Sequence, residues 1–148
     1  MTTPAPDIWT AFSQTVLELS LDPPVAFAVT EPMPQAVRTA ADAAAPGMGL
    51  AVVTSCNPDG INVSESDNAE ATNRLRAALV ARNLTPCAAL GRSADGSHQE
   101  PGFLIECTRD EARDLAHEWR QLAVFFIDPE GVWLIPADPR FRDKRLAS

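Results

Sequence analysis

The sequence lacks the cysteine pattern of a secreted, disulfide-stabilised protein. Its three cysteines, Cys56, Cys87 and Cys107, are widely spaced and form no CxxC motif. An odd number of scattered cysteines does not make a disulfide framework. The chain also shows no basic segment followed by an apolar one at its start, and no apolar run long enough to span a bilayer. We therefore expect a cytoplasmic protein without a membrane partner.

The common metal and nucleotide motifs are missing as well. The two histidines, His98 and His117, form neither an HxH nor an HxxxH motif, so no zinc site is expected. The sequence contains no Walker loop and no GxGxxG motif, so nucleotide binding by those routes is not indicated. A Cys–His pair would require Cys56 or Cys87 to lie beside His98, which the spacing permits without indicating it. We expect no metal and no cofactor.

Positive charge is scarce. The chain has 12 Lys and Arg residues against 20 Asp and Glu residues, and its formal net charge is −8. A protein that binds duplex nucleic acid needs a basic face to neutralise phosphates, whereas these basic residues are scattered apart from Arg140, Arg142, Lys144 and Arg145. Nucleic acid is therefore not expected as a partner. An acidic surface favours solubility, and an acidic protein–protein interaction module that docks on a basic partner is an alternative.

The length and the apolar content fit one globular domain. The chain has 148 residues, of which 45% are hydrophobic and 22% charged, and both fractions are close to globular averages. A chain of this size buries about two thirds of the surface that it exposes when unfolded. We expect a single domain over residues 1–148, with a flexible leader at 1–6, a core over 25–136 and a polar tail at 137–148.

Hydrophobic periodicity predicts helices that alternate with strands. The first pattern predicts a helix that starts at Asp7, carries Ile8, Phe12, Val16 and Leu19 on one face, and ends at the Asp22-Pro23-Pro24 segment. After it, strands are expected at 25–29, 49–54, 86–90, 103–107, 123–127 and 132–135. Helices are expected at 35–45, from 64 to about 82, and from 108 through 119, the last two opened by capping sequences.

The order of these elements indicates a fold class. From Gly49 onward the expected order is β-α-β-β-α-β-β. This order predicts an α+β fold in which two helices cover one face of a mostly antiparallel sheet, as in the split β-α-β or ferredoxin-like arrangement, with an N-terminal helical extension.

Three polar residues follow the strand expected at 49–54. Asn57 ends that strand and opens a turn, Ser64 stands at the start of the next helix, and Asn68 falls on the inner face of that helix. A helix N-terminus has free N–H groups and a partial positive charge that suit an anion. Our leading hypothesis is a small polar or anionic ligand that binds there. Alternatively the roles are structural: Asn57 as a turn residue, Ser64 as an N-cap worth about 1 kcal/mol, and Asn68 as a tie between loop and helix.

Two more polar residues lie further along the chain. Glu100 precedes the strand expected at 103–107, and a carboxylate near a loop can act as a general base. A small enzyme that uses Glu100 in this way, beside the same amides, is the second functional hypothesis. Gln121 joins the last helix to the next strand, where its amide either caps the connection or binds the ligand.

Several spaced motifs resemble one bacterial protein family. They are Thr54-Ser55-Cys56-Asn57-Pro58, then Ser64, Asn68 and Leu75, and later Pro86, Gly91, Glu100, Phe103-Leu104-Ile105, and Gln121 with Ala123-Val124-Phe125. Their order resembles the bacterial domain-of-unknown-function family 3293 over roughly Val25 to Leu134. The resemblance implies no agreed activity. It implies that Asn57, Ser64, Asn68, Glu100 and Gln121 correspond to the recurring polar residues of that family.

Overall fold

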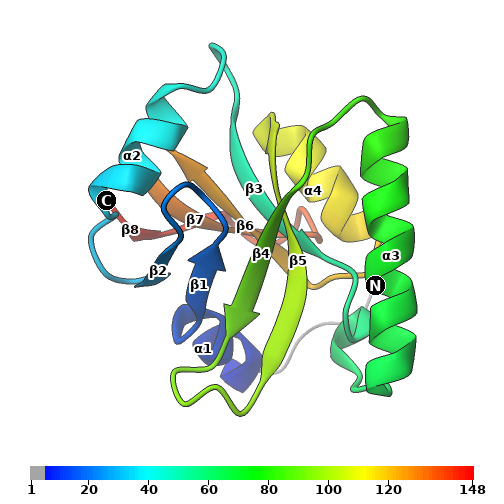
Figure 1. Ribbon diagram of the computed structural model, residues 1–148. Coiled ribbons are helices and arrows are strands. Elements are labelled where there is room, and N and C mark those ends of the chain that lie inside the picture. The colour runs from blue at the N-terminus through cyan, green and yellow to red at the C-terminus, as the bar shows by residue number, and fades with distance from the viewer. Residues whose placement is uncertain (1–5) are drawn as a thin grey trace.

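An antiparallel sheet of eight strands forms the centre of the structure, a computed structural model that describes residues 6–148 (Figure 1). Across the sheet the strands follow the order β2-β1-β4-β5-β3-β6-β7-β8. Their bounds are β1 Val16–Leu19, β2 Val25–Ala28, β3 Gly49–Thr54, β4 Cys87–Arg92, β5 Gln99–Cys107, β6 Ala123–Asp128, β7 Gly131–Pro136 and β8 Lys144–Ala147. The described residues also form four α-helices, namely α1 Pro6–Ser13, α2 Gln35–Asp42, α3 Glu65–Ala81 and α4 Arg109–Glu118, and a short 3₁₀ helix, η1 Pro58–Gly60. The predicted α+β class with a mostly antiparallel sheet is confirmed.

The sheet carries apolar side chains on both faces, because successive residues of a strand point to opposite sides. On central strand β3, Ala51 and Val53 pack in one cluster with Leu75 of α3 and Leu115 of α4. Leu50 and Val52 of the same strand belong to a second cluster, together with Val37 of α2 and with Leu17 and Leu19 of β1. Figure 1 accordingly shows α2 and α3 on opposite sides of the sheet. A strand that is buried on both faces reads as a continuous apolar run, which is how β3 was predicted.

The two longer helices begin where their capping sequences predict. Ser64 is the N-cap of α3, and its Oγ accepts a hydrogen bond from the backbone N–H of Asp67 at 3.0 Å. Thr108 and Glu111 form a complete capping box at the start of α4. Local hydrogen bonding of this kind is encoded within four residues of sequence, so it could be predicted without any knowledge of tertiary contacts.

The prediction of one long N-terminal helix is wrong. Helix α1 ends at Ser13, and Val16–Leu19 form strand β1 between β2 and β4. The spacing of Phe12, Val16 and Leu19 fits a helix, but Leu17 and Leu19 alternate with Glu18 and both are buried in the sheet. Two hydrogen-bonded neighbours and an apolar face stabilise the strand here, and such tertiary contacts override a local helical pattern. The apolar core therefore includes residues before Val25.

The segment expected as a polar tail also contains regular structure. Lys144–Ala147 form edge strand β8, which pairs with β7. Just before it, Asp143 is held by ion pairs to Arg109 and Arg113. Charged side chains are a common feature of edge strands because they discourage pairing with other chains. The charges that suggested a tail are thus compatible with a strand.

Candidate functional site

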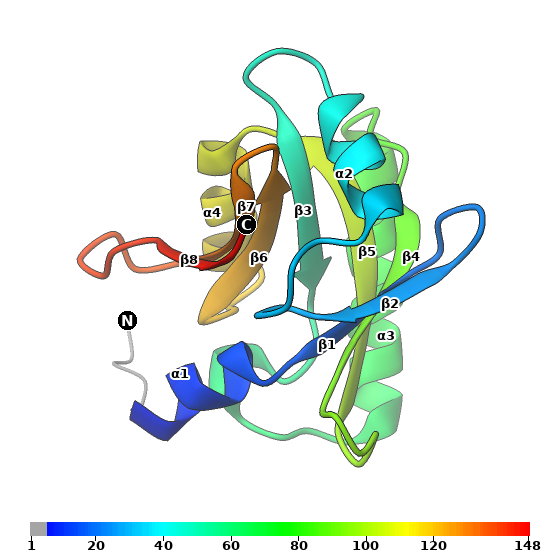
Figure 2. The same ribbon diagram turned by 90° about the vertical axis from the view of Figure 1, so that its left-hand side faces the viewer.

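A cavity of about 390 Å³ lies on the sheet face that carries Leu17 and Val52. Ala11 and Phe12 of α1 line it. Figure 2 shows α1 at the end of the sheet where β1 begins. The apolar wall of the cavity comes from Phe12 of α1, Leu17 of β1, Val52 of β3 and Phe125 of β6. Polar residues also reach this space from the loop after β3, the start of β5 and the segment just before β6, as well as from the segment before β1 and the end of β4. We call this space the Gly91 cavity, defined by its lining residues Ala11, Phe12, Gln14, Thr15, Leu17, Val52, Thr54, Asn57, Gly60, Asn62, Gly91, Arg92, Ser93, His98, Glu100, Gly102, Gln121, Leu122, Ala123, Val124 and Phe125.

Gly91 lines the cavity at a position where the strand carries no side chain. Gly91 of β4 pairs with Glu100 of β5 and with Leu17 of β1, so all three positions share one face. A Cβ atom added at Gly91 would be 3.7 Å from Thr15 Cγ2 and 3.9 Å from Leu17 Cδ2, which is ordinary contact distance. A larger side chain at this position would extend into the cavity. The absence of a side chain at Gly91 therefore leaves part of this space open.

Gly102, the second glycine in the cavity wall, is required for another reason. A Cβ atom there would lie 2.1 Å from the carbonyl oxygen of Val53. The backbones of β3 and β5 approach each other so closely that no side chain fits.

Asn57 lines the cavity, and Asn68 holds it in place. The backbone N–H of Asn57 donates to Asn68 Oδ1 at 2.9 Å, and Asn68 Nδ2 donates to Asn57 Oδ1 at 3.0 Å. Asn57 Oδ1 also accepts from the backbone N–H of Val63 at 3.1 Å. These bonds fix a left-handed conformation at Asn57, with φ of 47°, which asparagine tolerates better than most residues. Asn68 itself is not among the residues that line the cavity.

Ser64 lies outside the cavity as well. Its hydroxyl is engaged in capping α3, and the side chain is exposed. The first turn of α3 carries Glu65 and Asp67, whose negative charges already complement the positive end of the helix dipole. These acidic residues would repel an anion at this helix N-terminus.

Gln121 links two parts of the cavity wall. Its Nε2 donates to the backbone carbonyls of Cys56 at 3.0 Å and of Trp119 at 3.2 Å. Both amide hydrogens are thereby used within the protein. Its Oε1 is left as an acceptor, for which no partner is found among residues 6–148.

Glu100 lines the cavity beside His98. The Oε2 atom of Glu100 lies 2.7 Å from Nε2 of His98, and the two side chains are 28% and 54% exposed. The pair sits at the edge of the cavity, next to Gly91 and Gly102. The structure therefore brings three of the five predicted residues to one cavity, namely Asn57, Glu100 and Gln121.

The thiols of Cys56 and Cys87 do not line the cavity. The Sγ atom of Cys56 lies 3.6 Å from the carbonyl oxygen of Pro101 and 3.8 Å from Thr72 Oγ1. Burial raises the pKa of the Cys56 thiol, which lowers its thiolate content and its nucleophilicity at neutral pH. Cys87 Sγ donates to the carbonyl of Ser20 at 3.1 Å. Neither thiol contacts His98, so the alternative of a Cys–His pair is not realised in this structure.

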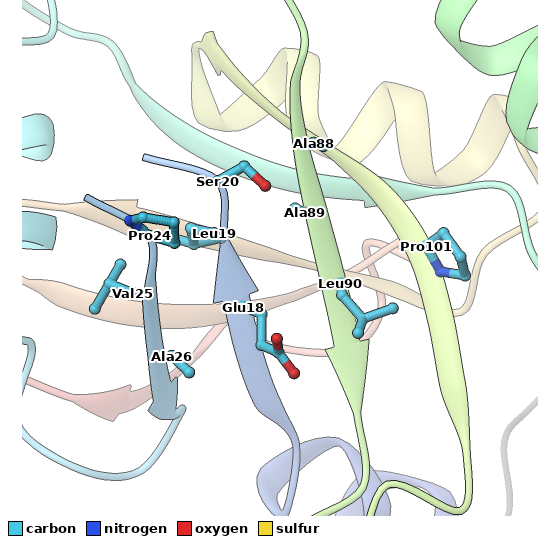
Figure 3. Close-up of a pocket in the computed structure, with 10 residues that line it drawn as sticks. All are labelled: Glu18, Leu19, Ser20, Pro24, Val25, Ala26, Ala88, Ala89, Leu90 and Pro101. Atoms are coloured by element: carbon cyan, nitrogen blue, oxygen red, sulfur yellow. The ribbon is translucent and has the colours of Figure 1, made fainter. Parts of the chain in front are cut away.

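A second cavity of about 390 Å³ lies over β2, β1 and β4 (Figure 3). Its lining is mainly small or apolar and includes Ala26, Ala88, Leu90 and Pro101. Its one charged residue, Glu18, forms an ion pair with Arg92. None of the five predicted residues lines it, and it lacks a set of converging polar groups.

Several residues of the Gly91 cavity were not singled out from the sequence. Phe12 was assigned to the face of a helix and His98 to a polar loop, whereas no role was assigned to Leu17 or Asn62. Their contribution depends on the packing of α1 and β1 against the ends of β4 and β5, which no local pattern encodes. Gly91, which ends the apolar run over residues 87–90 and precedes Arg92, is an available signal, because an isolated glycine in a strand can mark a close approach or a binding site.

Two general properties apply to the part of the chain that the structure describes. No helix within it is both long enough and apolar enough to cross a bilayer. No group of three or more His, Cys, Asp or Glu side chains within it is arranged to hold a metal ion.

Together these features define a small α+β protein with a partly apolar, partly polar cavity at one end of its sheet. Residues 53–124 match the model of a family described as Protein of unknown function (DUF3293). This match confirms the resemblance predicted from the motifs, over a shorter stretch than the expected Val25 to Leu134. The matched stretch contains Asn57, Glu100 and Gln121, whereas α1 and β1 precede it. No curated protein and no solved structure matches the chain.

Proposed function

We propose that this protein binds a small molecule in the Gly91 cavity. The observation that carries the proposal is the convergence of Asn57, Glu100 and Gln121 on one cavity of about 390 Å³ with an apolar wall. A mostly apolar pocket with a few placed polar groups is the usual form of a ligand site. The proposal keeps the small polar ligand of the leading hypothesis and moves it from the start of α3 to the sheet face beside α1.

The polar groups of the cavity retain hydrogen-bonding capacity. Asn57 uses its backbone N–H and its Oδ1 within the chain, which leaves Nδ2 as a donor. Gln121 uses its Nε2 and leaves Oε1 as an acceptor. Glu100 has one oxygen at His98 and a second one that accepts no hydrogen bond from another described residue. A ligand that matches this set would replace water without leaving buried polar groups unpaired.

The arrangement of the wall also supports a preformed site. Asn57 is held by Asn68 from α3, and Gln121 is held by two backbone carbonyls. Side chains that are already fixed lose little conformational entropy when a ligand binds. In this account Asn68 is a positioning residue and Ser64 is a helix cap.

The surrounding framework is proposed to be a ferredoxin-like split β-α-β unit within one domain. The spatial order β4-β5-β3-β6 and the shared apolar cluster of α3 and α4 support this assignment. We also propose that the protein acts in the cytoplasm. The free state of Cys56, Cys87 and Cys107 fits a reducing compartment.

A thermal-shift screen of small fragments tests the binding proposal, with two leucine variants of strand β4. Gly91→Leu places a side chain in the cavity, whereas Ala88→Leu places the same side chain on the opposite face of the strand. A fragment at about 100 times its Kd should stabilise the wild type by about 2.7 kcal/mol. We expect the same fragments to stabilise Ala88→Leu and to have no effect on Gly91→Leu. A screen without any hit, or hits that persist in Gly91→Leu, would refute the proposal.

The second candidate is an enzyme with Glu100 as general base. It is favoured by the 2.7 Å contact between Glu100 Oε2 and His98 Nε2 at the edge of the cavity, because a base held by a second titratable group is a common catalytic arrangement. Each fragment that binds would be incubated with the wild type and with Glu100→Gln, and its NMR spectrum followed over time. Turnover by the wild type that disappears in a Glu100→Gln variant with retained binding would support this candidate. If no bound fragment is converted by the wild type, the candidate is dropped.

A further inference from the structure

We infer that the ligand of the Gly91 cavity is a cationic amine on an apolar body, with its ammonium group held by Glu100. This inference rests on the proposed function and specifies the chemical class of the ligand. It follows from the positions of the titratable side chains Arg92, His98 and Glu100, from the hydrogen-bond acceptors that remain unpaired in the cavity, and from the aromatic part of the cavity wall.

The charge of the cavity is set by the strand register. Arg92, His98 and Glu100 are the titratable residues among its lining. Gly91 pairs with Glu100, and Arg92 pairs with the next residue along β5, Gln99. Because side chains alternate, Arg92 and Glu100 point to opposite faces of the sheet.

The arginine is neutralised on that opposite face. The Nε atom of Arg92 pairs with Glu18 Oε2, and its Nη1 donates to the carbonyls of Ser93 and Ala94. Glu18 lines the other cavity, shown in Figure 3. The guanidinium of Arg92 is therefore engaged by Glu18 and by two backbone carbonyls and is not available to an anionic ligand in the Gly91 cavity.

Glu100 therefore determines that the charge inside the cavity is negative. Its side chain is 28% exposed, whereas its neighbour His98 is 54% exposed and carries charge only when protonated. A partly buried carboxylate interacts more strongly with a charge than one in open solvent. A carboxylate or phosphate on the ligand would meet the like charge of Glu100, and a cation would be attracted.

The remaining acceptors match an ammonium group. An ammonium has three N–H donors and no acceptor. Glu100 contributes a carboxylate oxygen, and Gln121 contributes its Oε1, because its Nε2 is bound to two backbone carbonyls. A charged hydrogen bond of this kind contributes more to affinity than a neutral one.

The apolar body of the ligand is indicated by the opposite wall. The rings of Phe12 and Phe125 lie 6.1 Å apart in an edge-to-face arrangement, and both line the cavity. Leu17 and Val52 extend this surface. An aromatic or branched alkyl group would pack here, while its amine reaches Glu100 and Gln121 at the polar edge.

The test compares three molecules that share a phenyl group and a short linker but differ in charge. Binding of phenethylamine, phenethyl alcohol and hydrocinnamate to the wild type would be measured by isothermal titration calorimetry. We expect the amine to bind on the order of tenfold more tightly than the alcohol, since charged hydrogen bonds add more than neutral ones. The carboxylate should bind most weakly. In Glu100→Gln the advantage of the amine over the alcohol should vanish, while His98→Gln should keep the order of the three ligands.

The outcomes separate this inference from the proposed function. If the alcohol or the carboxylate binds as well as the amine, and Gly91→Leu abolishes binding, the cavity is a ligand site and the amine inference is wrong. If the advantage of the amine persists in Glu100→Gln, the inference is equally overturned. If none of the three binds the wild type, the amine inference fails, and the fragment screen decides the proposed function independently. Binding of the amine that persists in Gly91→Leu would overturn both.

Discussion

The two faces of the sheet differ in what the strands contribute at corresponding positions. On one face, β3 and β5 present Ala51, Val53, Phe103 and Ile105, which pack with Leu75 and its neighbours. On the other face, β4 presents a glycine at position 91 opposite a glutamate, and α1 bridges over the resulting space. Both faces carry a buried apolar cluster, but the second face also has an open space beside Gly91. The missing side chain at Gly91 contributes to that difference.

Replacement of Leu75 by alanine tests the packed face and should have the largest effect. The Leu75 side chain is fully buried between α3 and the sheet. Its truncation removes apolar contacts and leaves a cavity, at a cost of about 2–5 kcal/mol. Arg76→Ala, at the next and exposed position of α3, should change the free energy of unfolding by about 0.5 kcal/mol or less. Urea unfolding of both variants measures the contrast, and a similar small loss in each would contradict the packing described here.

The two glycines of the cavity should respond oppositely to alanine. Gly102→Ala forces a Cβ atom against the carbonyl of Val53 and should destabilise the protein by about 3 kcal/mol. Gly91→Ala meets only ordinary contacts, so it should be neutral or stabilise the fold by up to about 1 kcal/mol. Thermal and urea unfolding distinguish the two. Equal losses would mean that the space at Gly91 is not real.

The polar residues at the start of α3 provide a finer comparison. Asn68→Ala removes both hydrogen bonds to Asn57 and should cost about 2 kcal/mol. Ser64→Ala removes a single capping bond and should cost about 1 kcal/mol. Only the first change should also weaken ligand binding, because Asn57 lines the cavity and Ser64 does not. A Ser64→Ala variant that loses binding while Asn68→Ala retains it would favour a site at the helix N-terminus.

The smallest expected effect is a difference in the alkylation rate of the three cysteine thiols. Burial raises the pKa of Cys107 to about 12 and raises that of Cys56 as well. A raised pKa keeps both thiols protonated at pH 8, and protonated thiols react slowly with alkylating reagents. We expect rapid labelling of Cys87 alone in the folded protein, and of all three cysteines in urea. Mass spectrometry of peptides from a short labelling pulse reads this out, and early modification of Cys107 would contradict its burial.

Features that depend on local sequence could be predicted. The caps at Ser64 and Thr108 and the buried strand over 49–54 appear where the patterns placed them. The N-terminal helix was predicted to extend too far because the spacing of Phe12, Val16 and Leu19 fits a helix. Residues Val16–Leu19 form a strand instead, because they pair with β2 and β4.

The residues of the candidate site also divide into those that local sequence could predict and those that depend on tertiary packing. Asn57, Glu100 and Gln121 were singled out from their positions at strand ends, and the structure brings them to one cavity. Ser64 and Asn68 were grouped with Asn57 because both were expected on one side of the next helix, at its N-terminus. In the structure Ser64 caps α3 and Asn68 binds Asn57, and neither of the two lines the cavity. The contributions of Phe12 and Leu17 required the packing of α1 across the sheet, which depends on contacts far apart in the chain.

The most direct test of the account is an NMR titration of ¹⁵N-labelled protein with phenethylamine, or with the best fragment from the screen. The account predicts that shift changes concentrate on the backbone amides of Gly91, Glu100, Gly102 and Gln121. The start of α3 and more distant residues of the other cavity, such as Ala26, should change little. Changes centred on Ser64 and its neighbours would instead locate the ligand at the helix N-terminus and contradict the assignment of the Gly91 cavity.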